Sequence, residues 1–319
     1  MKTYSLGLSE VKVTPIIMGT WQAGKIMWAD IDDTESKKAV RTAFEQGITT
    51  FDTAEVYGNG HSERIVAASL TDVRDQVVYA SKVFVNHLKY DQVITACNRS
   101  LKNLKTDYID IYQIHWPSGS FGSEYVPIGE TMEAMNSLKE RKKILAIGVS
   151  NFSRKQIEEA SEYGRIDSLQ PPYSLFWRHV EDDAMKYCIE NRIKILAYSP
   201  LAQGFLTGKF GPDHKFSKGD HRSQSKLFKT ENYQRVQEAL KKLQPIAKKY
   251  DITLGQLALA WVISHSETCA IAGARNADQV RQNVKAAEIS ISPDDLIEID
   301  KISRMVTDPL DKNPVLWDF

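Results

Sequence analysis

The stretch QGITTFDTAEVYGNGHSE, residues 46 to 63, decides the fold class because it contains one complete strand-to-loop transition. Gly47 ends an amphipathic helix, and Thr49 to Thr53 follows as a short β-rich run. Polar and charged residues come directly after that run. A helix, a strand and a polar loop in this order form the repeating unit of a parallel α/β fold.

The glycines of this stretch raise the question of a phosphate-binding loop. A dinucleotide fingerprint has the form G-x-G-x-x-G, but Glu63 occupies the last position after Gly58-Asn59-Gly60. A glutamate there cannot give the close helix packing that the third glycine supplies. We therefore expect Gly58 and Gly60 to allow a sharp turn beside Tyr57, and we expect any nucleotide to bind elsewhere.

The same alternation of strand and helix extends over the whole chain. The β-rich runs are Ile16 to Met18, Thr49 to Thr53, Val77 to Ala80, Ile109 to Ile114, Ile144 to Val149, Ser168 to Gln170, Ile195 to Tyr198 and Ala270 to Ala272. Eight strands, seven intervening helices and one helix after the last strand predict a (β/α)₈ TIM barrel. We also expect an N-terminal β-hairpin from Tyr4 to Val13, with Gly7 near its turn, that plugs the bottom of the barrel. An extra C-terminal helix is expected from Asp294 to Met305, and residues 1–319 should form a single domain.

The composition is typical of a globular protein with a large core. Of the 319 residues, 42% are hydrophobic and 26% are charged. Because 41 basic and 41 acidic residues balance, no bulk charge favours nucleic acid or anionic lipid as a partner. No segment resembles a signal peptide or a membrane span, so we expect a cytoplasmic protein. The odd number and the spacing of Cys97, Cys188 and Cys269 suggest neither a disulfide framework nor a metal cluster.

Four ionisable residues of four types follow three consecutive strands. They are Asp52, Tyr57, Lys82 and His115, hereafter the tetrad. Barrel enzymes place their chemistry at the carboxyl ends of strands. Each residue alone has an ordinary structural explanation, such as a cap, an ion pair or a packed ring.

One reaction would use all four side chains of the tetrad. Reduction of a carbonyl by hydride leaves an alkoxide that must take a proton, and Tyr57 can give it if its pKa is lowered. A nearby Lys82 ammonium would lower that pKa, and Asp52 would hold Lys82 in place. His115 would orient the carbonyl oxygen through a ring N–H.

Six sequence blocks make the chain resemble the aldo-keto reductase superfamily over essentially its full length. In order, they are FDTAEVYGNGHSE, YASKV, IDIYQIHWP, IGVSNF, LAYSPLAQGFLTGK and IAGARNADQVRQN. The AYSPLAQG and GARN forms resemble the bacterial reductases related to the potassium-channel β subunits. The resemblance implies reduction of an aldehyde or ketone with NADP(H) as cofactor, no metal, the tetrad as catalytic residues and Tyr57 as the general acid.

The resemblance also implies a cofactor site along the barrel mouth, without a Rossmann domain. The residues that would contact its nicotinamide end are Gly19, Thr20, Trp21, Asp52, Ser150, Asn151, Gln170 and Tyr198. The residues that would follow the pyrophosphate are Ser199, Pro200, Leu201, Gln203, Gly204, Lys209 and Arg222. The residues that would meet the adenosine ribose phosphate and the adenine are Gly273, Arg275, Gln279 and Asn283.

The substrate pocket is expected beside the tetrad. The side chains that would form or extend it are Trp21, Tyr57, His115, Trp116, Phe176 and the tail near Trp317. The sequence does not name the carbonyl substrate or fix the oligomeric state.

Two other classes of protein compete with the reductase. One is a cofactor-holding regulatory or sensor subunit with incidental turnover. Such subunits usually carry an amino-terminal extension, whereas here the hairpin is expected within the first few residues. The other is an isomerase or lyase that uses Lys82 as a Schiff base, but this class does not explain Asp52, Tyr57 or the GARN block.

Overall fold

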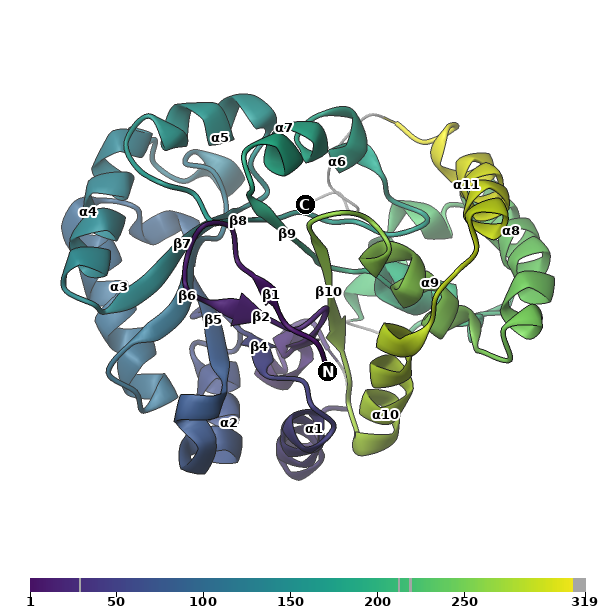
Figure 1. The fold of residues 1–319 in the computed structure, drawn as a ribbon, viewed down its shortest axis with the longest axis horizontal. Coiled ribbons are helices and arrows are strands. Elements are labelled where there is room, and N and C mark those ends of the chain that lie inside the picture. Colours follow the sequence, from purple (N-terminus) through teal and green to yellow (C-terminus); the bar gives the residue numbers. More distant parts are fainter. Residues whose placement is uncertain (29, 212, 218–219, 312–319) are drawn as a thin grey trace.

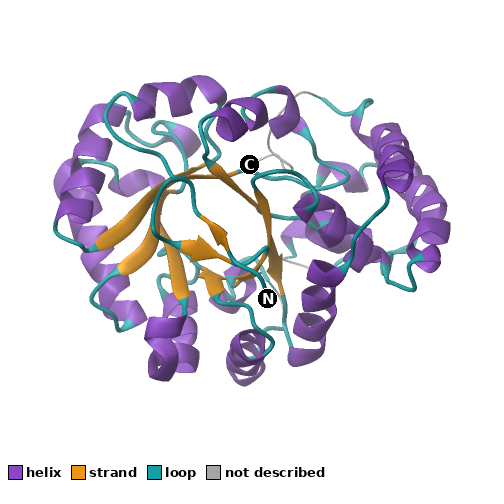
Figure 2. Ribbon diagram, in the orientation of Figure 1, coloured by secondary structure: helices purple, strands orange, loops and turns teal. Residues whose placement is uncertain are grey.

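Eight parallel strands form the centre of the protein. The computed structural model describes residues 1–28, 30–211, 213–217 and 220–311. The barrel strands are β3 (Ile16–Gly19), β4 (Thr50–Asp52), β5 (Val78–Val83), β6 (Ile109–Ile114), β7 (Ile144–Ser150), β8 (Ser168–Gln170), β9 (Lys194–Ala197) and β10 (Thr268–Gly273). They close in the order β10-β3-β4-β5-β6-β7-β8-β9, and Figure 2 shows them as a ring inside the helices. The predicted (β/α)₈ barrel is therefore confirmed.

The strand bounds differ from the predicted runs where polar residues continue a strand. β5 was expected to end at Ala80 but extends through Ser81 and Lys82 to Val83. Ser81 Oγ donates a hydrogen bond of 2.6 Å to the buried Glu63 carboxylate. A prediction from hydropathy alone ends the strand too early, because these polar side chains are buried with hydrogen-bond partners inside the protein.

Helices surround the barrel and cover each strand from outside. Those that follow the strands are α1 (Asp33–Glu45), α2 (His61–Leu70), α3 (Tyr90–Leu104), α4 (Ile128–Glu140), α5 (Arg154–Ser161), α6 (His179–Asp182), α7 (Met185–Glu190), α9 (Leu254–Ile263) and α10 (Ala277–Lys285). Two further helices, α8 (Thr230–Lys249) and α11 (Pro293–Thr307), pack against each other at the right of Figure 1. The predicted C-terminal helix is thus confirmed as α11. The expectation of one helix per connection is wrong for β8 to β9 and for β9 to β10, because the described residues of each connection form two α-helices.

The N-terminal hairpin closes one end of the barrel. β1 (Tyr4–Ser5) pairs antiparallel with β2 (Lys12–Val13), and Gly7 between them has a φ of +59°. Leu6, Val11 and Val13 pack into a buried cluster with the inward side chains of the barrel strands. Gly7 lies against Asp167 and Arg192, near the amino ends of β8 and β9, and Figure 1 shows the hairpin across the ring of strands. The predicted plug is confirmed, and the carboxyl ends of the strands face the opposite side.

Candidate active site

A cavity of about 1040 Å³ lies at the carboxyl ends of the strands. This volume is at the upper limit for sites that bind one drug-sized ligand, so it has room for an extended ligand. All of the residues expected from the resemblance to contact cofactor or substrate line this cavity, with the exceptions of Phe176 and Trp317. Lys82 is the one tetrad member outside the lining, and its side chain is fully buried behind Asp52 and Tyr57.

The structure brings the tetrad together because β4, β5 and β6 are neighbours in the barrel. Lys82 Nζ donates 2.7 Å hydrogen bonds to Asp52 Oδ1 and to the Thr53 carbonyl, and it lies 3.4 Å from Tyr57 Oη. The Tyr57 ring meets the His115 ring edge-on, with 5.8 Å between centroids. The buried ammonium thus lies between a carboxylate and a phenol.

Tyr57 reaches this position through the glycine turn that follows it. Gly58 and Gly60 have φ angles of +63° and +78°, a region that favours glycine. A Cβ on Gly58 would come within 2.4 Å of the Gly24 carbonyl oxygen. The sharp turn predicted from GNG is confirmed, and its glycines allow close contact between two backbone segments.

Burial controls the protonation of the tetrad. It raises the pKa of Tyr57 well above its ordinary value, and the Asp52 carboxylate raises that pKa further. The expected lowering of the Tyr57 pKa is therefore not found in this structure, where burial is the largest cause of the shift. Burial and the charge of Lys82 together lower the pKa of His115 well below its usual range. Near neutral pH, Tyr57 carries its proton and His115 is uncharged.

Burial also lowers the pKa of Lys82, and the Asp52 carboxylate opposes this shift. The second oxygen of that carboxylate, Oδ2, accepts a hydrogen bond of 2.9 Å from Gln170 Nε2. Asp52 therefore links the tetrad to the far side of the barrel mouth.

A hydrogen-bonded chain crosses the mouth at the ends of β6 to β9. Ser150 Oγ donates to the Gln170 carbonyl at 2.7 Å. Asn151 Nδ2 donates to the His115 carbonyl at 3.0 Å, and Tyr198 Oη donates to Asn151 Oδ1 at 2.8 Å. These polar groups form a fixed surface beside the tetrad.

The loop after β9 has polar groups that could meet a ligand. Ser199 and Gln203, which line the cavity, have φ angles of +52° and +57°, so the backbone is strained there. Both side-chain amide atoms of Gln203 are buried without a hydrogen-bond partner among the residues that the structure describes. A buried amide without partners is costly, and a polar ligand would satisfy it.

Two guanidinium groups line the cavity beside Trp28. Arg222 and Arg275 lie 5.3 Å and 5.4 Å from the centre of the Trp28 ring. Asp220 holds Arg222 through two hydrogen bonds. Burial, followed by repulsion from Arg222, lowers the pKa of Arg275. Two cations on the same side of the cavity favour an anion there.

The polar side chains that follow Arg275 support the same end of the cavity. Gln279 Oε1 accepts a hydrogen bond of 2.8 Å from the backbone N–H of Arg275. Asn283 Nδ2 donates a hydrogen bond of 3.3 Å to the Gly273 carbonyl. Both residues lie on α10, four positions apart, so one helix face lines this part of the cavity.

Sequence reasoning missed several aromatic lining residues and misplaced one. Trp28, Phe84 and Phe121 line the cavity, but they stand in loops whose course the sequence pattern does not predict. The placement of Phe176 at the pocket is wrong, because its side chain is fully buried in the core. Trp317 lies outside the described residues.

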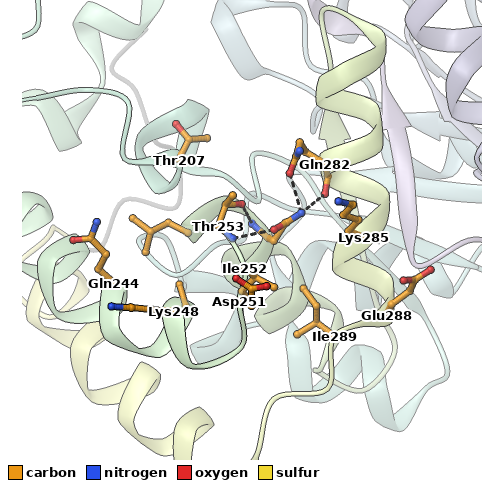
Figure 3. A pocket seen from close by; sticks show the side chains of 13 residues that line it. Thr207, Gln244, Lys248, Asp251, Ile252, Thr253, Gln282, Lys285, Glu288 and Ile289 are labelled. Atoms are coloured by element: carbon orange, nitrogen blue, oxygen red, sulfur yellow. Dashed lines mark hydrogen bonds between the residues drawn. The ribbon is translucent and has the colours of Figure 1, made fainter.

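A second pocket of about 840 Å³ adjoins the first beside α9 and α10 (Figure 3). Gln256 and Gln282 line both pockets. Gln256 Nε2 donates to the backbone and side-chain oxygens of Gln282, at 3.1 Å and 3.0 Å. This wall holds α10 against α9.

The described part of the chain contains neither a metal-binding cluster nor a helix suited to span a membrane. Within the described ranges, no cluster of three or more His, Cys, Asp or Glu side chains could hold a metal ion. None of the helices in the described part of the chain is both long and apolar enough to cross a membrane.

Comparison with known proteins identifies the class. A model of the aldo/keto reductase family matches residues 15–304, which is most of the chain. The chain therefore belongs to the aldo/keto reductase family of oxidoreductases, in agreement with the resemblance of its sequence blocks.

Individual relatives cover nearly the whole chain. Aldo-keto reductase YhdN of Bacillus subtilis is 33% identical over 97% of this chain and 96% of its own. An NADH-specific methylglyoxal reductase of Escherichia coli is 34% identical over 92% and 96%. A probable voltage-gated potassium channel subunit beta of Arabidopsis thaliana is 32% identical over 96% and 97%. The relatives of this chain thus include a member of the branch that contains the channel β subunits.

Solved structures show the same fold. The glycerol dehydrogenase of Gluconobacter oxydans has a TM-score of 0.88 and 30% identity, with 98% of each chain covered. An aldo-keto reductase of Klebsiella pneumoniae, solved in complex with NADPH, has a TM-score of 0.74 and 28% identity, with 97% of this chain and 96% of that chain covered.

Proposed function

We propose that this protein reduces aldehydes or ketones to alcohols with NADPH, and that Tyr57 is the general acid. The observation that carries the proposal is the buried Lys82 ammonium, held 2.7 Å from Asp52 and 3.4 Å from the Tyr57 hydroxyl. A phenol beside a fixed cation can donate a proton and leave a stabilised phenolate.

The residues of the tetrad divide the work of this reaction. NADPH, when bound, supplies the hydride. His115 is neutral, so one ring N–H can hold the carbonyl oxygen and stabilise the charge that develops on it. Tyr57 gives its proton to that oxygen, and Lys82 stabilises the phenolate that remains. Asp52 keeps Lys82 charged and in place.

The proposed cofactor site is the rim that the cavity provides. Ser150, Asn151 and Gln170 would bind the carboxamide of the nicotinamide, and Tyr198 would stack on its ring. The unpaired amide of Gln203 fits a polar ligand along the loop after β9, and the cations of Arg222 and Arg275 fit a phosphate. The residues proposed to bind the cofactor are Gly19, Thr20, Trp21, Asp52, Ser150, Asn151, Gln170, Tyr198, Ser199, Pro200, Leu201, Gln203, Gly204, Lys209, Arg222, Gly273, Arg275, Gln279 and Asn283.

The proposal treats residues 1–319 as one reductase domain acting on a small carbonyl compound. A Schiff base at Lys82 is less favoured because its nitrogen is fully buried and already donates to Asp52 and Thr53. A regulatory subunit that only binds NADP(H) remains the second candidate, in view of the plant relative named as a channel subunit. A complete tetrad beside the cavity supports turnover.

The replacement Tyr57→Phe tests the proposal. It removes the proton donor but keeps the ring, so kcat should fall by about 10²-fold to 10⁴-fold while the Kd for NADPH changes little. Oxidation of NADPH in the presence of a panel of small aldehydes and ketones measures kcat, and fluorescence titration measures the Kd for NADPH. The matched control Tyr163→Phe alters an exposed ring on α5's C-terminal side and should behave as the parent. Parental turnover in Tyr57→Phe would exclude Tyr57 as the acid.

A further inference from the structure

Glu55 is a buried carboxylate in the loop that carries Tyr57. This loop, residues 53–60, follows β4 and is hereafter called the Tyr57 loop. Only 4% of the Glu55 side chain is exposed, and Glu55 does not line the cavity, although Asp52 and Tyr57 do. A buried carboxylate is costly unless it is paired and hydrogen-bonded. Because Glu55 is not part of the tetrad, its contacts indicate what it does.

The partners of the Glu55 carboxylate belong to the segments that follow β5. Oε1 accepts a hydrogen bond of 2.7 Å from the backbone N–H of Phe84, and it lies 3.0 Å from His87 Nδ1. Oε2 accepts a hydrogen bond from the guanidinium of Arg99 on α3. Both oxygens therefore contact the β5–α3 unit, whereas Glu55 itself belongs to the preceding β4–α2 unit.

This contact lies beyond the end of the β-ladder between the two units. β4 ends at Asp52, and its register with β5 ends at the pair Asp52 and Ala80. Past that pair, the backbone N–H of Thr53 donates to the Ala80 carbonyl at 2.9 Å, and that of Glu55 donates to the Lys82 carbonyl at 3.4 Å. The second of these bonds is long. The Glu55 carboxylate therefore adds a short contact to β5 where the backbone pairing weakens.

The two segments that Glu55 joins carry the groups of the proposed proton transfer. Phe84 follows Lys82 by two residues, and Tyr57 follows Glu55 by two. A shift of the Tyr57 loop relative to β5 would therefore change the 3.4 Å separation between Tyr57 Oη and Lys82 Nζ. The Phe84 ring also contacts His115, with centroids 5.6 Å apart. Misplacement of a reacting group by about 1 Å can lower a rate about 10²-fold.

We propose that Glu55 is a positioning residue for the proton transfer. Its carboxylate holds the Tyr57 loop against the end of β5, and this contact sets the distance between the Tyr57 hydroxyl and the Lys82 ammonium. The inference rests on the proposed function and deepens it, because a residue outside the cavity fixes the place of the general acid. Glu55 acts through Tyr57 and touches neither cofactor nor substrate.

Glu55→Gln and Glu55→Ala test this inference. The amide keeps an oxygen for the Phe84 N–H but loses the charge that pairs with Arg99, so kcat should fall about tenfold, whereas the alanine removes both contacts and should lower kcat about 10²-fold. Because Glu55 does not line the cavity, the KM for the aldehyde that the parent reduces fastest and the Kd for NADPH should stay close to the parental values. The solvent isotope effect on kcat should rise, because proton transfer becomes slower relative to the other steps.

Amide hydrogen exchange gives a second readout, which needs neither cofactor nor turnover. Loss of the Glu55 contacts should speed exchange at residues 53–60 in the free protein, and the effect should be larger in Glu55→Ala than in Glu55→Gln. Mass spectrometry of peptides that cover these residues measures it.

Asp110→Asn is the matched control. Asp110 is a buried carboxylate that also accepts hydrogen bonds from a β5 backbone N–H, that of Tyr79 at 2.8 Å, and from a guanidinium, that of Arg74 at 2.7 Å. Tyr79 lies near the amino end of β5, whereas Phe84 follows its carboxyl end. This variant should have a lower melting temperature than the parent, but its kcat and its exchange at residues 53–60 should equal those of the parent.

Three outcomes would overturn the inference. They are parental kcat in both Glu55 variants, an equal fall of kcat in Asp110→Asn, and a rise in KM or in the Kd for NADPH that accounts for the whole loss of activity. Unchanged exchange at residues 53–60 would also contradict it, and if Glu55→Ala does not fold, Glu55→Gln alone decides. Each of these results leaves the proposed function intact, because Tyr57→Phe tests that function separately. Absence of turnover with all carbonyls in the parent would instead overturn the proposed function and the inference with it.

Discussion

At the residue scale, burial sets the pKa values of the tetrad, which the spacing of its residues in the sequence does not predict. The types and order of Asp52, Tyr57, Lys82 and His115 were enough to predict that they meet at one rim, because each stands at or just after the carboxyl end of a strand of a parallel barrel. The pKa of Tyr57 is shifted in the direction opposite to the predicted one, because the sequence does not show that the phenol is buried beside Asp52. Spacing along the chain gives neighbours, whereas a pKa depends on exposure to solvent.

The residues missed at this scale share a physical reason. Phe121 and Trp28 stand in loops without a repeating pattern, and Phe121 depends on a left-handed backbone that only flanking glycines hint at. Phe176 was misplaced because an aromatic residue after a strand can face the cavity or the core. Only the path of the loop after β8 decides between the two.

Arg275→Ala should weaken NADPH binding and leave NADH binding almost unchanged. The two cofactors differ by one phosphate, and a charged hydrogen bond contributes about 1.5 to 3 kcal/mol. Arg275 is partly exposed, so screening reduces this and we expect about a tenfold increase in the Kd for NADPH. Fluorescence titration of both cofactors against the parent measures the effect.

The control for this comparison is Arg281→Ala, which removes an exposed guanidinium from the same helix, α10. Both Kd values should stay close to those of the parent in this variant. An equal loss of affinity for NADPH and NADH in Arg275→Ala would remove Arg275 from the proposed phosphate site. One relative, from E. coli, is named NADH-specific, so the two Kd values would show whether this protein differs from that relative in its cofactor preference.

At the element scale, hydrophobic periodicity predicted the type of most elements but not their exact bounds. All eight strand runs are present, because strands buried on both faces form short continuous apolar segments. Two short helices, α6 and α7, and the additional helix α8 were not separated from their neighbours. Their ends depend on contacts with distant segments, such as those of α8 with α11.

Asp295 joins the two extra helices, and its replacement by asparagine should lower the melting temperature near neutral pH. Its carboxylate accepts hydrogen bonds from Lys249 Nζ and Ser292 Oγ at 2.7 Å each, and from Tyr250 Oη. The bond from Lys249, followed by those from Tyr250 and Ser292, lowers the pKa of Asp295 from 3.8 to about 2. The carboxylate therefore stabilises the α8–α11 contact when it is charged.

The pH dependence of this effect has a definite sign. Because the folded-state pKa is depressed, the stabilisation is complete above the unfolded value near 3.8 and is lost as the pH falls toward about 2. The melting temperatures of the parent and Asp295→Asn should converge over that range in calorimetry. Asp294→Asn, in the same first turn of α11, is the control and should lose less stability at neutral pH. A constant gap down to pH 2 would contradict the assignment.

At the scale of the whole molecule, the barrel has a closed end that contributes to stability and an opposite end with the proposed catalytic residues. The hairpin β1–β2 closes the amino ends of the strands, and the tetrad and cavity occupy the carboxyl ends. The connected interior between them includes Ile17, Ala80 and Ile111. Conservative changes at the closed end should therefore alter the free energy of unfolding without altering turnover.

Leu6→Ala tests this separation. The Leu6 side chain is fully buried in the hairpin plug, so truncation leaves a cavity and should cost about 2 to 5 kcal/mol of unfolding free energy. Urea denaturation measures that loss, and kcat per folded molecule should equal that of the parent. Leu8→Ala, in the same hairpin but 60% exposed, should leave the free energy of unfolding within about 0.5 kcal/mol of the parent. A fall in kcat for Leu6→Ala at full folding would mean that the plug and the tetrad are coupled through the barrel interior, and the separation of the two ends would be wrong.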